Sequence, residues 1–230
     1  MTQTRNRFVH INQRIEQAFK QSGRGIDDSV TLLAVSKHHP LDKIKQLYAL
    51  GQRDFGESYV QEALKKITAA SEQDIIWHFI GPIQANKTRD IARHFRWVHS
   101  VDRIKIARRL SQQHPEHQAA LNICLQVNIS EEAQKSGFST AELFLIMEEI
   151  IQLPRLNIRG LMTIPRAGDN LEQQKKTFHH LKSLMQDLNS QFKLNMDTLS
   201  MGMSNDLETA IIEGATIVRI GTALFGPREY

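Results

Sequence analysis

The sequence predicts a single domain that folds as a parallel (β/α)8 barrel. About eight short runs of apolar and β-branched residues alternate with segments of helical periodicity along the 230 residues. This length is near the usual size of such a barrel. An open, doubly wound sheet would have the same order of elements, but no Gly-x-Gly-x-x-Gly motif follows the first strand. We therefore expect residues 1–230 to form one barrel domain.

The expected strands are runs that are too short and too rich in β-branched residues to be helices, as is typical of buried parallel strands. In chain order they cover residues 31–37, 53–56, 75–80, 97–101, 121–129, 158–164, 198–203 and 216–221.

Helices are expected before the first strand and between successive strands. The N-terminal helix, from about residue 4 to residue 21, carries Phe8, Ile11, Ile15 and Phe19 at helical spacing. The later helices are expected near residues 40–51, 57–70, 84–94, 103–113, 139–150, 170–191 and 204–214. No helix is expected after the last strand, and the N-terminal helix could take that place in the outer ring.

Helix-starting residues support several of these boundaries. Asp102 is a good N-cap for the helix from residue 103, and Ser204 is expected to cap the helix from residue 204. Ser139 and Glu142 have the spacing of a capping box. Pro40 suits the first turn of its helix, and Gly51 suits the position just past the end.

Composition narrows the class of protein. The 29 Lys and Arg against 25 Asp and Glu give a net charge of +4, which is too weak to argue for nucleic-acid binding. Cys124 is the only cysteine, so no internal disulfide is expected, and its apolar surroundings predict a buried thiol. Neither a membrane-length apolar stretch nor a signal peptide is visible, so we expect a cytoplasmic protein.

Lys37 ends the first strand, Thr31-Leu32-Leu33-Ala34-Val35-Ser36-Lys37. The carboxyl ends of barrel strands form the face where ligands bind. An amine that is partly shielded from water there can become a nucleophile toward carbonyls. The alternative is an ordinary lysine that ends a strand and points to water.

Two further groups at the strand ends suggest a ligand with a phosphate and a ring. Barrels often bind phosphate with the loops after strands seven and eight, where this chain has Met201-Gly202-Met203-Ser204 and Gly221-Thr222. Arg219 lies between two apolar residues of the last strand, so strand alternation turns it to the opposite face. It could bind a ring nitrogen, or it could pair with a barrel carboxylate such as Glu57.

A nucleophilic lysine, a phosphate site and an arginine that faces a ring acceptor together indicate pyridoxal 5'-phosphate (PLP). Lys37 would hold it as a Schiff base, and Arg219 would face the pyridine nitrogen. Because arginine keeps that nitrogen unprotonated, the ring would be a poorer electron sink than with an aspartate.

Six sequence blocks resemble the pyridoxal phosphate homeostasis protein family, which is itself similar to the N-terminal barrel domain of alanine racemase. The blocks are LLAVSKHHP, FGESYVQEA, WHFIGPIQANK, NISEEAQKSGF, IRGLMTIP and LSMGMSNDLETAIIEGATIVRIGTALFG. The resemblance covers nearly the whole chain. It implies a (β/α)8 barrel like that racemase domain, with PLP on Lys37.

The resemblance also implies the other site residues. It places Ser200, Ser204, Gly221 and Thr222 around the phosphate, Arg219 at the ring nitrogen, and Met201 and Gly202 in the adjoining loop. Ser58 stands where the family more often has Asn. Lys135 matches a family lysine linked to accessory cofactor handling, although a solvated loop charge is the alternative. His78 is expected to be either a core histidine or part of the cofactor wall.

The resemblance implies a carrier or buffer of PLP that affects amino-acid and vitamin B6 balance, with PLP-dependent apo-enzymes as expected recipients. Alanine racemases use a second domain that supplies a catalytic tyrosine. This chain ends at Tyr230 soon after the last strand. We therefore expect no racemase activity, a monomeric state and no membrane partner.

Two alternative functions remain open at this point. One is a PLP-dependent amino-acid racemase or decarboxylase that uses residues not yet identified. The other is a nucleic-acid binder, which rests on basic residues at 87–96 and 103–109 without any accompanying binding motif. A metal site is not expected, because the pairs His38-His39 and His179-His180 are adjacent residues whose side chains diverge.

Overall fold

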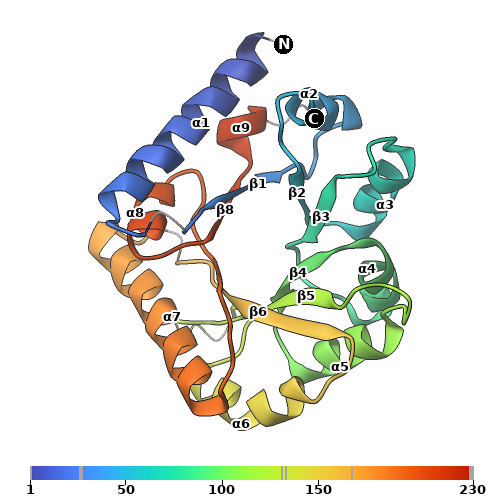
Figure 1. The fold of residues 1–230 in the computed structure, drawn as a ribbon, viewed down its shortest axis with the longest axis vertical. Coiled ribbons are helices and arrows are strands. Elements are labelled where there is room, and N and C mark those ends of the chain that lie inside the picture. Colours follow the sequence, from blue (N-terminus) through green and yellow to red (C-terminus); the bar gives the residue numbers. More distant parts are fainter. Residues whose placement is uncertain (1, 26–27, 131, 133, 167, 228–230) are drawn as a thin grey trace.

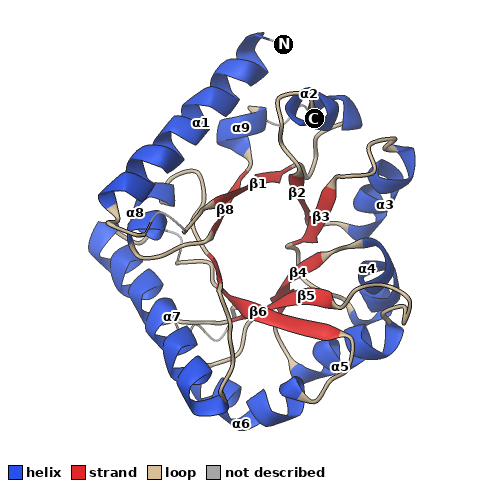
Figure 2. Cartoon of the chain, viewed as in Figure 1, coloured by secondary structure: helices blue, strands red, loops and turns tan. Residues whose placement is uncertain are grey.

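Eight parallel strands close into a barrel in the order β1-β2-β3-β4-β5-β6-β7-β8 (Figure 1). The computed structural model describes residues 2–25, 28–130, 132, 134–166 and 168–227. Figure 2 shows the helices as a ring outside the strands. The ring closes where β1 pairs with β8, from Thr31 opposite Ile217 to Ala34 opposite Ile220. The predicted (β/α)8 barrel is confirmed, and the open sheet is excluded.

All the expected strands are present in the structure. Most are shorter than their apolar runs because the last residues of a run leave the hydrogen-bonded ladder and enter the loops at the carboxyl face. The strands are β1 (Thr31–Val35), β2 (Asp54–Glu57), β3 (Ile76–Phe79), β4 (Trp97–Val101), β5 (Leu121–Gln126), β6 (Leu156–Met162), β7 (Thr198–Ser200) and β8 (Ile217–Ile220).

The expected helices are also present, but the one expected over residues 84–94 begins with the 3-10 turn η1. The expectation of no helix after the last strand is wrong, because the short helix α9 follows β8. The helical elements are α1 (Thr2–Gln21), α2 (Leu41–Tyr48), α3 (Val60–Ala69), η1 (Ala85–Lys87), α4 (Thr88–His94), α5 (Ile104–Gln113), α6 (Thr140–Ile151), α7 (Leu171–Phe192), α8 (Leu207–Ile212) and α9 (Thr222–Phe225). None of the helices in the described ranges is both long and apolar enough to cross a membrane.

Two of the expected helix caps are wrong. Arg103 occupies the N-cap position of α5 and makes no side-chain cap, while the Asp102 carboxylate binds the Arg103 guanidinium at 2.7 Å. Helix α8 begins only at Leu207, because residues 203–206 form a turn in which Asp206 Oδ1 accepts the backbone N–H of Met203. The Ser139 capping box is confirmed.

Helix α1 packs against α8 and α9, beside the last strand of the barrel (Figure 1). Its buried face includes Ile11 and Ile15. Arg14 binds the Glu208 carboxylate of α8 at 2.6 Å, and Arg7 donates to the carbonyl of Phe225 in α9 at 3.1 Å. The N-terminal helix thus covers the region that a full helix after β8 would cover, as predicted.

Candidate functional site

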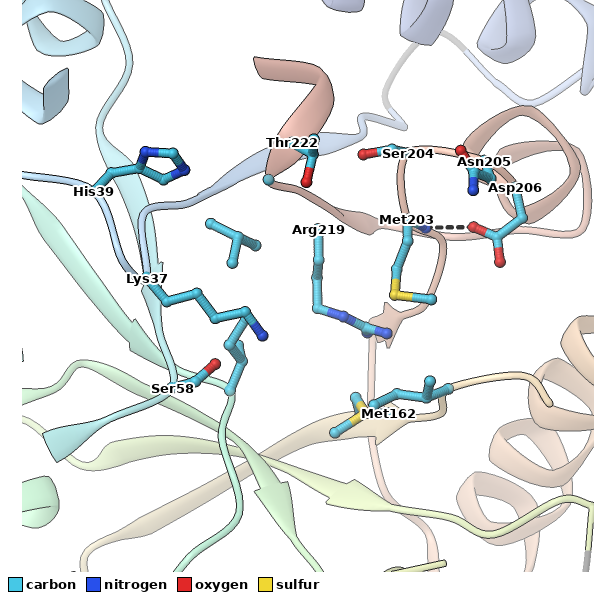
Figure 3. A pocket seen from close by; sticks show the side chains of 14 residues that line it. Lys37, His39, Ser58, Met162, Met203, Ser204, Asn205, Asp206, Arg219 and Thr222 are labelled. Carbon is cyan, nitrogen blue, oxygen red and sulfur yellow. Dashed lines mark hydrogen bonds between the residues drawn. The ribbon is translucent and has the colours of Figure 1, made fainter. Parts of the chain in front are cut away.

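A cavity of about 330 Å³ opens at the carboxyl ends of the strands. Its walls come from the ends of β1, β2, β3, β6, β7 and β8 or from the loops that follow them (Figure 3). The lining residues are Val35, Lys37, His39, Ser58, Ile80, Met162, Ile164, Met203, Ser204, Asn205, Asp206, Arg219, Gly221 and Thr222. Six of the residues predicted for the site are among them: Lys37, Ser58, Ser204, Arg219, Gly221 and Thr222.

Lys37 reaches into this cavity from the loop after β1. Figure 3 shows its side chain extending toward the centre of the cavity, in the direction of the Arg219 side chain. Strand alternation explains the direction, since Val35 and Lys37 line the cavity while the Ser36 hydroxyl between them donates to the Glu57 carboxylate at 2.6 Å. The lysine is half-buried. The geometry therefore supports the reactive amine of the sequence analysis over a lysine that points to bulk water.

Buried charges outside the barrel fix the backbone around Lys37. The Lys66 amine of α3 donates to the carbonyl of Ser36 at 2.8 Å and to the carboxylates of Glu57 and Glu62 at 2.7 and 2.6 Å. Glu62 also accepts the backbone N–H of His38 at 2.6 Å. Burial raises the pKa of the Glu57 carboxyl, and Lys66 opposes that shift.

Arg219 is buried beneath the cavity, with its guanidinium exposed to the cavity side (Figure 3). NH1 donates to the carbonyl and, at 2.8 Å, to the hydroxyl of Ser200, and NH2 donates to the carbonyl of Thr163 at 2.9 Å. Burial lowers the pKa of this guanidinium to about 10. The expected alternative, an ion pair with Glu57, is wrong, because Glu57 turns outward to Lys66.

Ser204, from the loop after β7, and Thr222, at the start of α9, both line the cavity (Figure 3). Ser200, Met201 and Gly202, which were also predicted for the site, do not line the cavity. Gly202 has φ 93°, and a Cβ there would lie 2.6 Å from the Cβ of Ala210. Gly202 therefore lets the loop after β7 pack closely on α8, while Ser204 and Thr222 line the cavity.

The structure places the last two predicted residues away from this cavity. His78 is buried inside the barrel, and its Nε2 lies 3.0 Å from Asp54 Oδ1. Of the two roles expected for His78, this position fits a core histidine. Lys135 binds Glu132 and lines a neighbouring cavity of about 280 Å³. That second cavity shares Ile80 and Ile164 with the first.

Sequence reasoning missed His39 and Asp206 in the lining. His39 stacks on the ring of Phe225 in α9, with centroids 4.9 Å apart. Burial raises the pKa of the Asp206 carboxyl. Both residues lie in loops, where strand alternation gives no signal about direction, and α9 itself was not predicted. Among the described residues no group of three or more His, Cys, Asp or Glu could hold a metal ion.

Comparisons with known proteins agree with this geometry. The family described as "Alanine racemase, N-terminal domain" matches residues 12–229. A pyridoxal phosphate homeostasis protein of Pseudomonas aeruginosa is 53% identical over 223 residues, which cover 97% of this chain and 95% of that protein. The structure of PipY from Synechococcus elongatus with PLP bound has a TM-score of 0.81 at 37% identity, covering 92% of this chain and 100% of PipY.

The fold and the lysine and arginine of the cavity define a class, the barrels related to the N-terminal domain of alanine racemase. Within that class, this chain belongs to the pyridoxal phosphate homeostasis protein family. An alanine racemase from Corynebacterium glutamicum has a TM-score of 0.68 at 16% identity, over 98% of this chain and 61% of the racemase. That likeness shows the shared barrel alone.

Proposed function

We propose that this protein binds pyridoxal 5'-phosphate as a Schiff base on Lys37 and serves as a cytoplasmic carrier or buffer of that cofactor. The observation that carries the proposal is the cavity itself. One amine, one buried guanidinium and two hydroxyl side chains line the same 330 Å³ space. The relatives' name and the PLP bound to PipY support the identity of the ligand.

The residues present fit the chemical groups of PLP. The hydroxyls of Ser204 and Thr222, with the backbone of Gly221, would bind the phosphate. Arginine has five donor hydrogens, and barrel acceptors take three of those of Arg219 in the described hydrogen bonds. The remaining donors would face the ring nitrogen, which would have to accept and therefore stay unprotonated.

Lys37 would make the covalent bond. Its amine would condense with the aldehyde of the cofactor to form a C=N bond, with the aldehyde oxygen released as water. Because the bond is reversible by water, the same residue can load and release the cofactor.

The carrier role follows from the homeostasis name of the relatives and from the weak electron sink that an arginine partner gives to the ring. Recipients would be PLP-dependent apo-enzymes. Transfer can be tested by mixing the loaded protein with a PLP-dependent apo-enzyme and following the enzyme's recovery. Recovery no faster than with the same concentration of free cofactor would reject delivery and leave buffering.

The binding site is tested by the visible absorbance of the purified protein after addition of PLP. Wild type and Lys105→Ala, an exposed lysine of α5, should both show a band that resists dialysis and is fixed by borohydride. Lys37→Ala should show neither property. A dialysis-resistant band of full size in Lys37→Ala would refute the proposal.

A PLP-dependent racemase is the second candidate. The observation in its favour is that the Asp206 carboxyl, whose pKa burial raises, lines the same cavity as Lys37 and offers a second titratable group. Sustained conversion of L- to D-amino acid that is lost in both Lys37→Ala and Asp206→Asn would establish this activity and displace the carrier role.

A further inference from the structure

A line of hydrogen bonds crosses the barrel interior from its amino-terminal mouth to Arg219. Asp54 Oδ1 lies 3.0 Å from His78 Nε2, and His78 Nδ1 lies 2.9 Å from His99 Nε2. His99 Nδ1 lies 2.7 Å from Ser200 Oγ, which accepts from Arg219 at 2.8 Å. We call these five residues the hydrogen-bond relay. They come from β2, β3, β4, β7 and β8, so only barrel closure brings them together.

With Asp54 a carboxylate and both imidazoles neutral, only one direction of donation fits the relay. Arginine donates and never accepts, so Ser200 Oγ accepts from Arg219 and gives its own hydrogen to His99 Nδ1. The Nε2–H of His99 then donates to His78 Nδ1, and the Nε2–H of His78 donates to Asp54. Both imidazoles are then Nε2–H tautomers that accept at Nδ1. The reverse direction would require a protonated Asp54 or a charged His78.

The surroundings of the relay favour this neutral arrangement. His78 and His99 are 1% and 0% exposed. Burial lowers the pKa of both rings, and for His99 the neighbouring His78 and Arg219 add to that effect. Water therefore does not compete for the internal hydrogen bonds, and each one depends on its protein partner.

The relay ends at the Arg219 guanidinium, and the groups that accept its described hydrogen bonds are uncharged. In the described hydrogen bonds, Arg219 donates to the carbonyls of Ser200 and Thr163 and to the Ser200 hydroxyl. Asp206 lines the same cavity and acts on Arg219 through space. The other carboxylate linked to this guanidinium is Asp54, at the far end of the relay.

We propose that the relay positions Arg219 for the ring nitrogen of the cofactor, an inference that rests on the function proposed above. Asp54, His78, His99 and Ser200 are positioning residues, since none of them lines the cavity. Each donated hydrogen fixes the next acceptor, so the Asp54 carboxylate orients the Ser200 hydroxyl and leaves its lone pair for NH1 of Arg219. A residue at the opposite mouth of the barrel thereby acts on the cofactor site.

Cofactor affinity tests the proposal, measured by absorbance titration of the apo-protein with pyridoxal 5'-phosphate. Asp54→Ala removes the terminal acceptor and should weaken binding about three- to tenfold, the effect of one net hydrogen bond. Asp54→Asn keeps a carbonyl acceptor and should stay within about twofold of wild type. Asp74→Asn is the matched control, because it removes an exposed carboxylate that precedes β3 and lies outside the relay.

A second set of variants separates positioning from general destabilisation. Asp54→Ala is repeated in an Arg219→Gln background and in a Ser200→Ala background. Ser200→Ala interrupts the relay but keeps Arg219. If Asp54 acts through Arg219, Asp54→Ala should weaken PLP binding by less than a further factor of about two in either background, because the effects of coupled residues are not additive. An equal loss in all backgrounds, or unchanged affinity in Asp54→Ala, would overturn the proposal.

The direction of the relay can be measured without any cofactor. Nitrogen-15 spectra of the ligand-free protein should show protonated Nε2 and unprotonated Nδ1 for both His78 and His99. A protonated Nδ1 on either ring would overturn the relay as drawn. A wild type that binds no PLP would refute the proposed function, and the role of the relay with it, even where the tautomers are as expected.

Discussion

The Lys66 amine lies 2.8 Å from the Ser36 carbonyl, one residue before Lys37 in the chain. The same amine binds the fully buried Glu57 carboxylate at 2.7 Å. A cation on the outer side of β1 and β2 therefore holds the backbone that directs Lys37 inward. Removing it would affect both the stability of the barrel and the placement of the cavity amine.

Lys66→Met should lower the free energy of unfolding by about 3–5 kcal/mol, because it leaves the Glu57 charge buried and unpaired. Urea unfolding followed by circular dichroism measures the loss. Lys65→Met is the matched control, because Lys65 is exposed on the same helix, and its effect should stay within about 0.5 kcal/mol. Adding Glu57→Gln to Lys66→Met should recover part of the loss. Equal effects of the two lysine substitutions would contradict this account.

Cys124 should be unreactive in the folded protein. Its thiol is fully buried, and burial raises its pKa to about 12, so the thiolate is scarce at neutral pH. A thiol reagent at pH 8 should label the native protein only as fast as it unfolds, and should label the urea-unfolded protein at once. Rapid labelling of the native protein would show that the β5 region opens.

The apolar runs were enough to predict the barrel, because a buried parallel strand needs a continuous apolar segment. The run that ends at Lys37 and the run around Arg219 both became strands of the closed sheet. The apolar pattern did not predict the turn before α8. There the Asp206 side chain captures the Met203 N–H and delays the helix by three residues after Ser204, a local competition that the spacing does not reveal.

The lysine and arginine of the cavity were predictable because each depends on one strand and its alternation. The pairing of His78 with His99 was not, because it depends on the register between two strands. The alternative that paired Glu57 with Arg219 was wrong, because the sequence does not show which face of β2 carries Glu57.

Gly202→Ala should destabilise the protein by about 2–4 kcal/mol. The position has φ 93°, and the new Cβ would meet the Ala210 Cβ at 2.6 Å. Gly51→Ala separates the two causes, since Gly51 has φ 101° but no atom within 4 Å of the added Cβ. The difference between the two variants in urea unfolding reports the clash. Equal losses would mean that the loop yields to the methyl group.

Stability should fall as the pH drops below about 6.5, partly because of His99. Burial first, then His78 and Arg219, hold the pKa of this imidazole well below its usual value. Between the folded and unfolded pKa values the unfolded chain binds the extra proton, so acid favours unfolding. From pH 6.5 to 5 one such histidine costs about 2 kcal/mol. Urea unfolding across this range should therefore show a shallower pH slope for His99→Gln than for wild type. His94→Gln, exposed on α4, should keep the wild-type slope, whereas a wild-type slope in His99→Gln would show that His99 does not stay neutral in the fold.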